Sequence, residues 1–373
     1  MPDNLLIIAG EPSGDALGGP LAEEIHRIKP NLELWGYGGE KMRAAGVEIL
    51  SEVEELAVMG FVDVLGRLPE MFRRLRDLSA EAVTRKVDGA VLIDYPGFNI
   101  RLAERLAKRG IPVVYYVSPQ VWAWKPGRVH RLAKSVSRML TILPFEEEIY
   151  RQTSLPVTFV GHYFLDTVSQ KASPAEFRAE LGLDEPLLLL LPGSRKQEVS
   201  RLLEPMLGAF AILSGRIENL HGLIIKAPGL PDGLFDFPEN PRLKIIEDNA
   251  IDAMFASTAA ICCSGSATLQ CALAELPHAI TYLTDTISAA IYRRFIKTPH
   301  IGLSNLVAGR EISQELLQSD ATAKNLASAI EPFLTDSAAR RDKVVDLGEI
   351  RAKLGQPGAS RRAAGAVISE IYG

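Results

Sequence analysis

The stretch "LLIIAGEPSGDALGG" at residues 5–19 places a glycine-rich turn directly after an apolar run. The run predicts a buried strand, and the turn predicts a crossing into a helix for which Ser13 and Asp15 are candidate N-caps. The glycine spacing matches neither the dinucleotide motif G-x-G-x-x-G nor the P-loop motif G-x-x-x-x-G-K-[ST]. We therefore expect this turn to line a crevice at the carboxyl end of a first strand, and other segments must identify its ligand.

Apolar runs of strand length alternate with amphipathic stretches of helical length along the whole chain. The predicted strands are residues 4–9, 32–36, 89–94, 112–117, 137–143, 186–191, 221–226, 242–246, 258–263 and 278–282. The predicted helices include residues 67–86, 98–109, 195–214 and 321–334. Such alternation is typical of parallel sheets covered on both faces. It predicts two doubly wound α/β domains, residues 1–165 and 166–349, with an active site in the cleft between them.

The composition is that of a globular protein, with 47% hydrophobic and 23% charged residues and a net charge of −5. The cysteines, Cys262, Cys263 and Cys271, are clustered without zinc spacing, which favours a reducing compartment. The N-terminus carries no signal-peptide pattern, so we expect a cytoplasmic protein. The most apolar stretch, residues 259–274, is broken by Ser264-Gly265-Ser266 and predicts strand, turn and helix rather than a membrane span. No nucleic-acid partner is expected, and the oligomeric state stays open.

The segment from Asn99 to Leu140 is strongly basic, with nine Lys and Arg residues against the single acid Glu104. Trp122 and Trp124 lie within it. Cations among large aromatic side chains suit an anionic lipid surface or a phosphorylated ligand. The alternative is a solvated face next to two core tryptophans.

Two turns in the second half predict an anion site. In "LLLLLPGSRKQEV" (187–199) Gly193, Ser194 and Arg195 open a helix after an apolar strand. In "CCSGSATLQCALAE" (262–275) the same order recurs, with hydroxyls at Ser264, Ser266 and Thr268 around Gly265. Free amides at two helix N-termini, these hydroxyls and Arg195 are suited to a diphosphate, although Ser and Thr are also common caps. The chain contains no Asp-x-Asp, the pattern of acidic oxygens expected for Mg²⁺, so we expect a mechanism without metal or cofactor.

A carboxylate at the end of a strand is the candidate base. "GAVLIDYPGFN" (89–99) ends its apolar run in Asp94, which is placed to take the proton of a sugar hydroxyl in an inverting glycosyl transfer. Asp94 could instead cap the following helix or fix the Tyr95-Pro96 turn. Glu11 and Asp15 are the other acids expected near the cleft, either sharing this work or binding acceptor hydroxyls. His162 lies at the predicted hinge, where a structural role is the alternative to a site role.

Nine motifs occur together in order and resemble the family of lipid-A-disaccharide synthases, glycosyltransferase family 19 with the GT-B fold. They are "AGEPSGD" (9–15), "ELAVMGFVDVLGRL" (55–68), "IDYPGFN" (93–99), "YYVSPQVWAWKPGRV" (115–129), "LPFE" (143–146), "GH" (161–162), "LLPGSR" (190–195), "SGSATLQ" (264–270) and "NLVAGRE" (305–311). The resemblance implies transfer from UDP-2,3-diacylglucosamine to 2,3-diacylglucosamine 1-phosphate, giving a β(1→6) disaccharide and UDP. It implies work on the cytoplasmic face of the inner membrane of Gram-negative bacteria.

The resemblance also implies roles for individual residues. Asp94 is the expected base on the acceptor 6-hydroxyl. Glu11, Ser13, Gly14, Asp15 and His162 belong to the acceptor side. The UDP site is expected to comprise Gly193, Ser194, Arg195, Ser264, Gly265, Ser266, Thr268, Gln270 and Asn305. A last helix at about residues 350–373 is expected to pack back on the first domain.

Two other functions stay open at this point. One is another GT-B enzyme acting on a UDP-sugar, such as a UDP-GlcNAc 2-epimerase or a peptidoglycan glycosyltransferase. The other is a two-lobed binding protein without catalysis, which would need no carboxylate aimed at the cleft. Because the substrates of the resembled family carry acyl chains, we expect peripheral membrane contact. The candidate regions are residues 59–76, 122–125 and 289–297.

Overall fold

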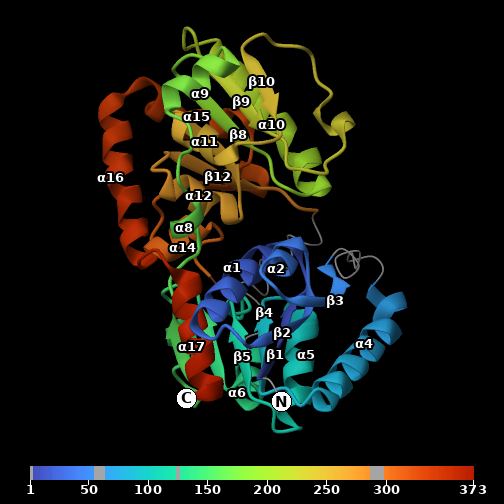
Figure 1. Cartoon of the computed structure of the whole chain (residues 1–373). Helices are drawn as coiled ribbons and strands as arrows, with labels where there is room; N and C mark the ends of the chain where they lie inside the picture. The colour runs from blue at the N-terminus through green and yellow to red at the C-terminus, as the bar shows by residue number, and fades with distance from the viewer. Residues whose placement is uncertain (1–2, 54–63, 123–126, 286–297) are drawn as a thin grey trace. The chain divides into compact units, whose positions relative to one another are not determined.

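The chain folds into two compact α/β units in a computed structural model that describes residues 3–53, 64–122, 127–285 and 298–373. The first unit comprises residues 1–163 and 355–373, and the second comprises residues 164–354. Each unit is built around one parallel sheet (Figure 1). The predicted fold class, two doubly wound parallel-sheet domains, is confirmed.

The sheet of the first unit has the strand order β3-β2-β1-β4-β5-β6-β7. Its strands are β1 (Asn4–Ala9), β2 (Glu33–Gly38), β3 (Glu48–Glu52), β4 (Gly89–Ile93), β5 (Val113–Tyr116), β6 (Arg138–Thr141) and β7 (Val157–Phe159). Its helices are α1 (Pro12–Ile28), α2 (Glu40–Ala44), α4 (Val64–Thr84), α5 (Pro96–Ala107), α6 (Arg128–Ser135), α7 (Glu146–Tyr150) and α17 (Ala359–Tyr372). The strand order reverses between β1 and β4, which is where doubly wound sheets bind ligands.

The sheet of the second unit has the strand order β10-β9-β8-β11-β12-β13. Its strands are β8 (Leu187–Leu191), β9 (His221–Ile225), β10 (Leu243–Ile246), β11 (Ala259–Cys263), β12 (His278–Tyr282) and β13 (Glu315–Leu317). Its α-helices are α8 (Phe164–Thr167), α9 (Pro174–Leu181), α10 (Lys196–Ser214), α11 (Ala250–Ala256), α12 (Ser266–Leu273), α14 (Leu303–Ala308), α15 (Ala323–Thr335) and α16 (Ser337–Lys353). Short 3₁₀ turns occupy Asp232–Phe235 and Gln318–Asp320. The order reverses between β8 and β11.

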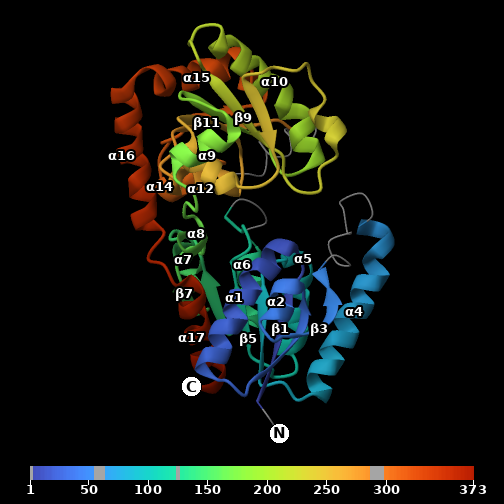
Figure 2. The same ribbon diagram turned by 45° about the horizontal axis from the view of Figure 1, so that its top comes forward.

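The second unit has a core on each face of its sheet because successive residues of a strand point to opposite faces. Leu188 and Leu190 of β8 belong to a core that includes residues of α10 and α15, which pack against each other (Figure 2). Leu187, Leu189 and Leu191 belong to the core on the other face, with residues of α9 and α11. This explains why the strand is an unbroken run of leucines.

The C-terminal helix α17 packs on the first unit, beside α1 (Figure 1). Arg138 donates to the Glu370 carboxylate at 2.8 Å, and the Tyr372 hydroxyl donates to Asp88 at 3.0 Å. Ile371 fills the space over Gly89, where an added Cβ would lie 2.6 Å from the Ile371 Cδ1. The last residues of the chain are therefore part of the first unit's structure.

Three strands were not predicted from the sequence: β3, β7 and β13. All three are edge strands of three to five residues, and none has the fully buried pattern of the central strands. The predicted strand–turn–helix at residues 259–274 is observed as β11 and α12. Among the described residues, no helix combines the length and the apolarity that crossing a membrane would require.

Candidate active site

The Asp94 turn leaves β4 at the point where the strand order of the first sheet reverses. Asp94 and Tyr95 both have left-handed backbone conformations, with φ of 46° and 45°, which is uncommon for side chains other than Gly and Asn. The Asp94 carbonyl accepts hydrogen bonds from the Tyr115 hydroxyl at 2.6 Å and from the buried Asn99 amide at 2.9 Å. The Asp94 amide donates to the Tyr116 carbonyl. The strained turn is thus held by strand β5 and helix α5.

The carboxyl of Asp94 has a raised pKa. Burial and then the nearby charge of Glu11 raise it from 3.8 to about 6, against a hydrogen bond from the Tyr95 amide. Glu11 follows β1, and β1 pairs with β4 in the register Ala9↔Ile93, so the two turns are neighbours. A base with a pKa near neutrality is ionised at pH 7 and still holds a proton strongly. The structure therefore places Glu11 and Asp94 together at the switch point, and the pKa of Asp94 is raised toward neutrality.

Gly10 permits this close approach of the two turns. An added Cβ at Gly10 would lie 2.1 Å from the Tyr95 ring. The ring of Tyr95 also stacks on Phe98 with centroids 6.0 Å apart. Packing against the Asp94 turn therefore requires a glycine at this position.

Asp15 has a structural role in the observed fold, which corrects the expected helix cap. Helix α1 begins at Pro12 after Glu11, so Ser13 and Asp15 lie inside its first turn and neither caps it. The buried Asp15 carboxylate accepts hydrogen bonds from the amides of Gly39, Lys41 and Met42 at 2.7, 3.1 and 3.0 Å. It thereby holds the start of α2. Ser13 is exposed at the same turn, and Gly14 is buried with its Cα facing Ala9.

Glu146 is a third carboxyl near Asp94 that the sequence analysis did not single out. It is buried, its Oε2 accepts from the Leu143 amide at 3.1 Å, and Trp122 lies close to it. Burial raises its pKa to about 8, and the Asp94 charge adds to this. Trp122 packs edge-on against Phe145 with centroids 5.5 Å apart. The "LPFE" motif contained the only sequence signal for this neutral acid.

His162 and Tyr163 lie at the end of the first unit. His162 is buried and stacked on Tyr163 at 4.7 Å, and burial lowers its pKa to about 3. It is therefore neutral at physiological pH and cannot act as a cation toward a phosphate. Burial, with a contribution from the Asp94 charge, raises the pKa of Tyr163 to about 12, which places this tyrosine near the Asp94 turn.

The turn between β8 and α10 differs from the expected cradle of free amides. The Glu198 carboxylate accepts from the amides of Ser194 and Arg195 at 3.1 and 3.2 Å. It also pairs with the Arg195 guanidinium at 2.9 Å, although 80% of that side chain is exposed. An added Cβ at Gly193 would lie 2.6 Å from Glu198 Oε2. The N-terminus of α10 is thus capped by an acid of the chain itself, and its anion-binding capacity resides in the exposed Arg195.

The turn between β11 and α12 is more open. Gly265 adopts φ 157°, and no described atom lies within 4 Å of an added Cβ there. Ser266 is exposed, and the first amides of α12 have no partner within the helix. The hydroxyls of Ser264 and Thr268 donate to the carbonyls of Ile301 and Gly265 at 3.1 and 2.8 Å. Gln270 is half-buried on the next turn of the helix.

These two turns meet at one edge of the second sheet. β8 and β11 are adjacent and parallel, in the register Leu191↔Cys262, so both chains turn at the carboxyl edge. Burial raises the pKa of the Cys263 thiol to about 12, and the charges of Glu198 and Arg195 also act on it. Arg195 therefore lies next to the end of β11, and the predicted grouping of the Arg195 turn with the turn at 264–270 is what the topology produces.

Asn305 is not available to a ligand in the observed structure. Its Nδ2 donates to the Ser313 carbonyl at 2.7 Å and to Glu315 at 2.8 Å. Its Oδ1 accepts from the amides of Ile312 and Ser313, both at 2.9 Å. All four hydrogen-bonding positions of the amide are used, so Asn305 fixes the segment between α14 and β13. The expected contact of this residue with UDP is withdrawn.

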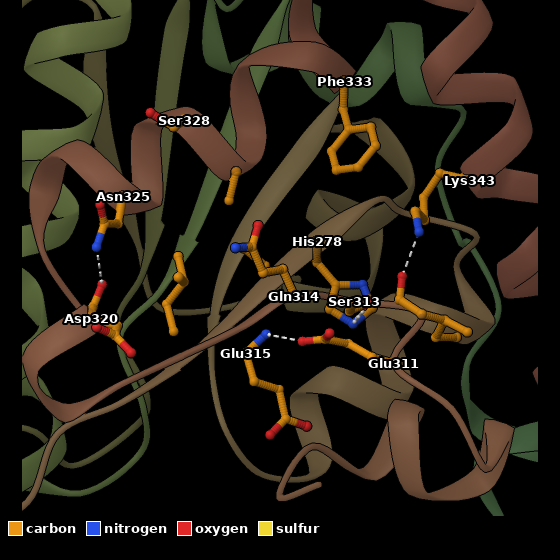
Figure 3. A pocket seen from close by; sticks show the side chains of 14 residues that line it. His278, Glu311, Ser313, Gln314, Glu315, Asp320, Asn325, Ser328, Phe333 and Lys343 are labelled. Atoms are coloured by element: carbon orange, nitrogen blue, oxygen red, sulfur yellow. Dashed lines mark hydrogen bonds between the residues drawn. The ribbon is translucent and has the colours of Figure 1, made fainter.

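A pocket of about 760 Å³ lies beside the edge strand β13 and contains none of the predicted site residues (Figure 3). His278, at the amino end of β12, contacts Ser313 at 3.1 Å, and Lys343 donates to the Ile312 carbonyl at 2.6 Å. The predicted donor residues instead follow the carboxyl ends of β8 and β11. The pocket therefore follows the edge strand β13, whereas the predicted donor residues follow the two central strands of the second sheet.

Comparison with known proteins identifies the family. A family model described as Lipid-A-disaccharide synthetase matches residues 5–369. The chain belongs to this family. The lipid-A-disaccharide synthase of Anaeromyxobacter dehalogenans (strain 2CP-C) is 39% identical over 372 residues, which cover 98% of this chain and 97% of the relative. The resemblance predicted from the motifs is confirmed, and the chain is a glycosyltransferase of lipid A biosynthesis.

Solved structures of two other proteins share the fold at low sequence identity. The calicheamicin glycosyltransferase CalG4 has a TM-score of 0.64 at 15% identity, with both chains covered completely. MnaA from S. aureus, solved with UDP, has a TM-score of 0.66 at 11% identity, covering 100% of this chain and 97% of that one. At this identity the likeness shows the fold alone. The choice among functions comes from the lipid-A-disaccharide synthetase family, which sets aside both an epimerase and a binding protein without catalysis.

Proposed function

We propose that this chain transfers the sugar of UDP-2,3-diacylglucosamine to the 6-hydroxyl of 2,3-diacylglucosamine 1-phosphate. The single observation that carries the assignment of the chemistry is the Asp94 carboxyl at the switch point of the first sheet, with its pKa raised to about 6. Membership of the lipid-A-disaccharide synthetase family supplies the substrates.

In the proposed reaction Asp94 accepts the proton of the acceptor hydroxyl. The hydroxyl oxygen attacks the anomeric carbon of the donor, the bond from that carbon to the diphosphate oxygen breaks, and UDP leaves with the electron pair. Direct displacement inverts the anomeric centre, which accounts for a β linkage from an α-linked donor. Glu11, Ser13 and Gly14 at the adjacent turn, with His162, are proposed for the acceptor side, and Asp15 supports them by holding α2.

The departing diphosphate is proposed to bind the second unit. Arg195 supplies the positive charge, and the open turn at Gly265 and Ser266 supplies amides at the start of α12. Charge that grows on the leaving oxygen is stabilised most by donors already in place. Gln270, half-buried on α12, is proposed as a hydrogen-bonding residue for the nucleoside.

The substrates carry acyl chains, so we propose that the enzyme works at the surface of the inner membrane. The expected contact region 289–297 lies outside the described residues, as do residues 59–63 of the first region and all of region 122–125 except Trp122. On the described part of α4, Phe72 is 46% exposed and Arg73 and Arg76 are exposed, whereas Leu75 and Leu78 belong to the core. The exposed side of α4 thus combines an aromatic residue with cations.

The test is incubation of the purified chain with UDP-2,3-diacylglucosamine and 2,3-diacylglucosamine 1-phosphate in detergent micelles. We expect UDP and disaccharide 1-phosphate in equal amounts, with a β(1→6) linkage by NMR. Release of UDP without disaccharide, or no reaction with the acceptor present, would contradict the proposed transfer. UDP-GlcNAc in place of the acylated donor serves as the control for an epimerase or a transferase of water-soluble sugars.

A further inference from the structure

A second pocket lies in the first unit, at the N-terminal ends of α5 and α6. It has a volume of about 290 Å³ and is lined by Pro96, Ile100, Arg101, Gly127, Arg128 and Arg131. This is close to the smaller end of the range for ligand sites. Among the residues that the structure describes, six line the pocket; three of them are arginines and none is acidic.

The three arginines differ in the partners they have. Arg131 forms two bonds to Glu104, at 2.8 and 3.0 Å, and Arg101 donates to the Gly97 carbonyl. Arg128 is half-buried, and it has no hydrogen bond or ion pair with any residue that the structure describes. Burial lowers its pKa, and the charges of Arg131 and Arg101 lower it further against the effect of Tyr115. A half-buried guanidinium among like charges is costly unless an anion completes the site.

The pocket adjoins the Asp94 turn. Pro96, two residues after Asp94, forms part of its wall. Arg128 acts electrostatically on Tyr115, whose hydroxyl donates to the Asp94 carbonyl at 2.6 Å. An anion in the pocket would therefore lie close to the candidate base, in the same unit and at the same edge of the sheet.

We propose that the pocket of Arg101, Arg128 and Arg131 binds a phosphate monoester, and that this is the anomeric phosphate of the acceptor sugar. The assignment to the acceptor rests on the proposed function. Guanidinium groups bind phosphate oxygens through paired hydrogen bonds, and a monoester offers more charge than the diester of a membrane phospholipid. C1 and C5, which carries C6, both flank the ring oxygen of a hexose, so the anomeric phosphate and the 6-hydroxyl lie at the same end of the ring. A phosphate anchored in the pocket, next to the turn that carries Asp94, therefore keeps the 6-hydroxyl near that turn.

The experiment compares two acceptors, 2,3-diacylglucosamine 1-phosphate and the same sugar without phosphate, for wild type, Arg128→Gln and Arg128→Lys. For the phosphorylated acceptor, we expect Arg128→Gln to lower kcat/KM about 10- to 100-fold, mainly through KM. For the acceptor without phosphate, wild type and variant should be equal. Arg128→Lys keeps the positive charge but loses the two parallel hydrogen bonds of a guanidinium, so its kcat/KM should lie between those of wild type and Arg128→Gln. Arg27→Gln is the matched control, because Arg27 is exposed at the far end of α1 and should not change either value.

Other outcomes overturn the proposal. Equal losses with both acceptors would mean that Arg128 only supports the fold, which thermal unfolding would show independently. If Arg128→Gln keeps the wild-type kcat/KM with both acceptors, the pocket does not bind the phosphate of the acceptor. A loss of binding to vesicles of anionic phospholipid, with unchanged preference between acceptors, would assign the pocket to the membrane. If wild type forms no disaccharide at all, the proposed function fails instead. In that case the pocket is tested by binding of radiolabelled inorganic phosphate, with glucosamine 1-phosphate as the competitor. Weaker binding of both to Arg128→Gln than to wild type supports a phosphate site, and equal binding overturns it.

Discussion

The chemistry assigned to Asp94 depends on its environment more than on its identity. Its backbone lies in a strained left-handed turn held by Tyr115 and Asn99. Its carboxyl is half-buried beside Glu11, so the ionised form is disfavoured and the pKa rises to about 6. Glu146, the third acid of the group, stays protonated at neutral pH because its pKa is about 8. One residue of the group is thus ionised and basic while its buried neighbour is neutral.

The pH dependence of the reaction follows from these values. The base form of Asp94 exists above a pKa of about 6, so kcat/KM should fall with one-proton slope as the pH drops below 6. Burial is the larger cause of the raised pKa and the Glu11 charge is the smaller. Glu11→Gln should therefore shift the acidic side of the kcat/KM profile to lower pH, while the pKa of Asp94 stays above its ordinary value of 3.8. The measurement is kcat/KM from pH 4.5 to 8.5, with the exposed Glu23→Gln on the same helix as control. If kcat/KM of the wild type falls only near pH 4, the assignment of Asp94 as the base would be contradicted.

Arg195 should bind UDP although it is paired with Glu198. Because 80% of its side chain is exposed, the guanidinium can move from Glu198 to a diphosphate without opening a cavity in the core. We expect Arg195→Ala to weaken UDP binding about 10-fold or more, as for hydrogen bonds to charged groups, and to slow transfer as well. Calorimetric titration with UDP measures the first effect. Arg216→Ala, beyond the other end of α10 and paired with Glu331, is the control. Equal UDP affinity in the Arg195 and Arg216 variants would place Arg195 outside the site.

At the scale of elements, the central strands were predictable because each is a continuous apolar run buried on both faces. The edge strands β3, β7 and β13 were not predictable, since they are short and partly exposed and carry no such run. Helix starts showed a similar limit. The sequence could not reveal that Glu198 would occupy the amides at the start of α10, or that Asp15 would cap α2 instead of its own helix. Both contacts depend on tertiary geometry.

The candidate site shows the same limit, because some of its residues could be predicted from the sequence and others could not. Asp94 and Arg195 could be proposed from the sequence because each belongs to the turn that follows a buried strand, and such turns lie at the carboxyl edge of a parallel sheet. Asn305 was assigned to UDP from its motif, whereas its amide is consumed by backbone contacts. Glu146 was missed because nothing local distinguishes a buried, neutral glutamate from a solvated one.

Helix α4 supplies the prediction for membrane contact. Arg74 is half-buried and donates to Ser51 at 2.7 Å and to Glu70 at 3.1 Å, so it is not one of the exposed cations of α4. The variant that tests the surface is Arg73→Ser with Arg76→Ser. Binding to vesicles of anionic phospholipid should fall about fivefold for each cation, and more at low salt. Thermal stability should be unchanged. Arg27→Ser with Arg151→Ser, both exposed, is the control pair. Equal binding by the two pairs would exclude α4 as a docking surface.

At the scale of the whole molecule, the two units carry different halves of the proposed reaction. Asp94 with Glu11 in the first unit, and Arg195 with Ser266 in the second, lie at the switch point of their own sheet, β1 with β4 and β8 with β11. The match to Lipid-A-disaccharide synthetase extends over residues 5–369, so both units belong to the family.

The whole reaction should proceed without added metal. The chain has no Asp-x-Asp to hold Mg²⁺ against a diphosphate, and we propose that Arg195 and the start of α12 neutralise the diphosphate instead. We therefore expect the rate of disaccharide formation in excess EDTA to equal the rate in untreated enzyme. A rate that falls with EDTA and returns with Mg²⁺ or Mn²⁺ would show that the leaving group needs a cation.

The most direct test of the account is the turnover of Asp94→Asn. The variant should fold, because a carboxyl whose folded pKa lies above its unfolded value costs stability once ionised, so the neutral amide is no worse at pH 7.5. With both substrates saturating, we predict that kcat falls by about 10²- to 10⁴-fold, the usual contribution of a general base, while UDP binding and thermal stability match wild type. Asp77→Asn, at an exposed position of α4, should retain full turnover. An Asp94→Asn enzyme with near-normal kcat would contradict the account.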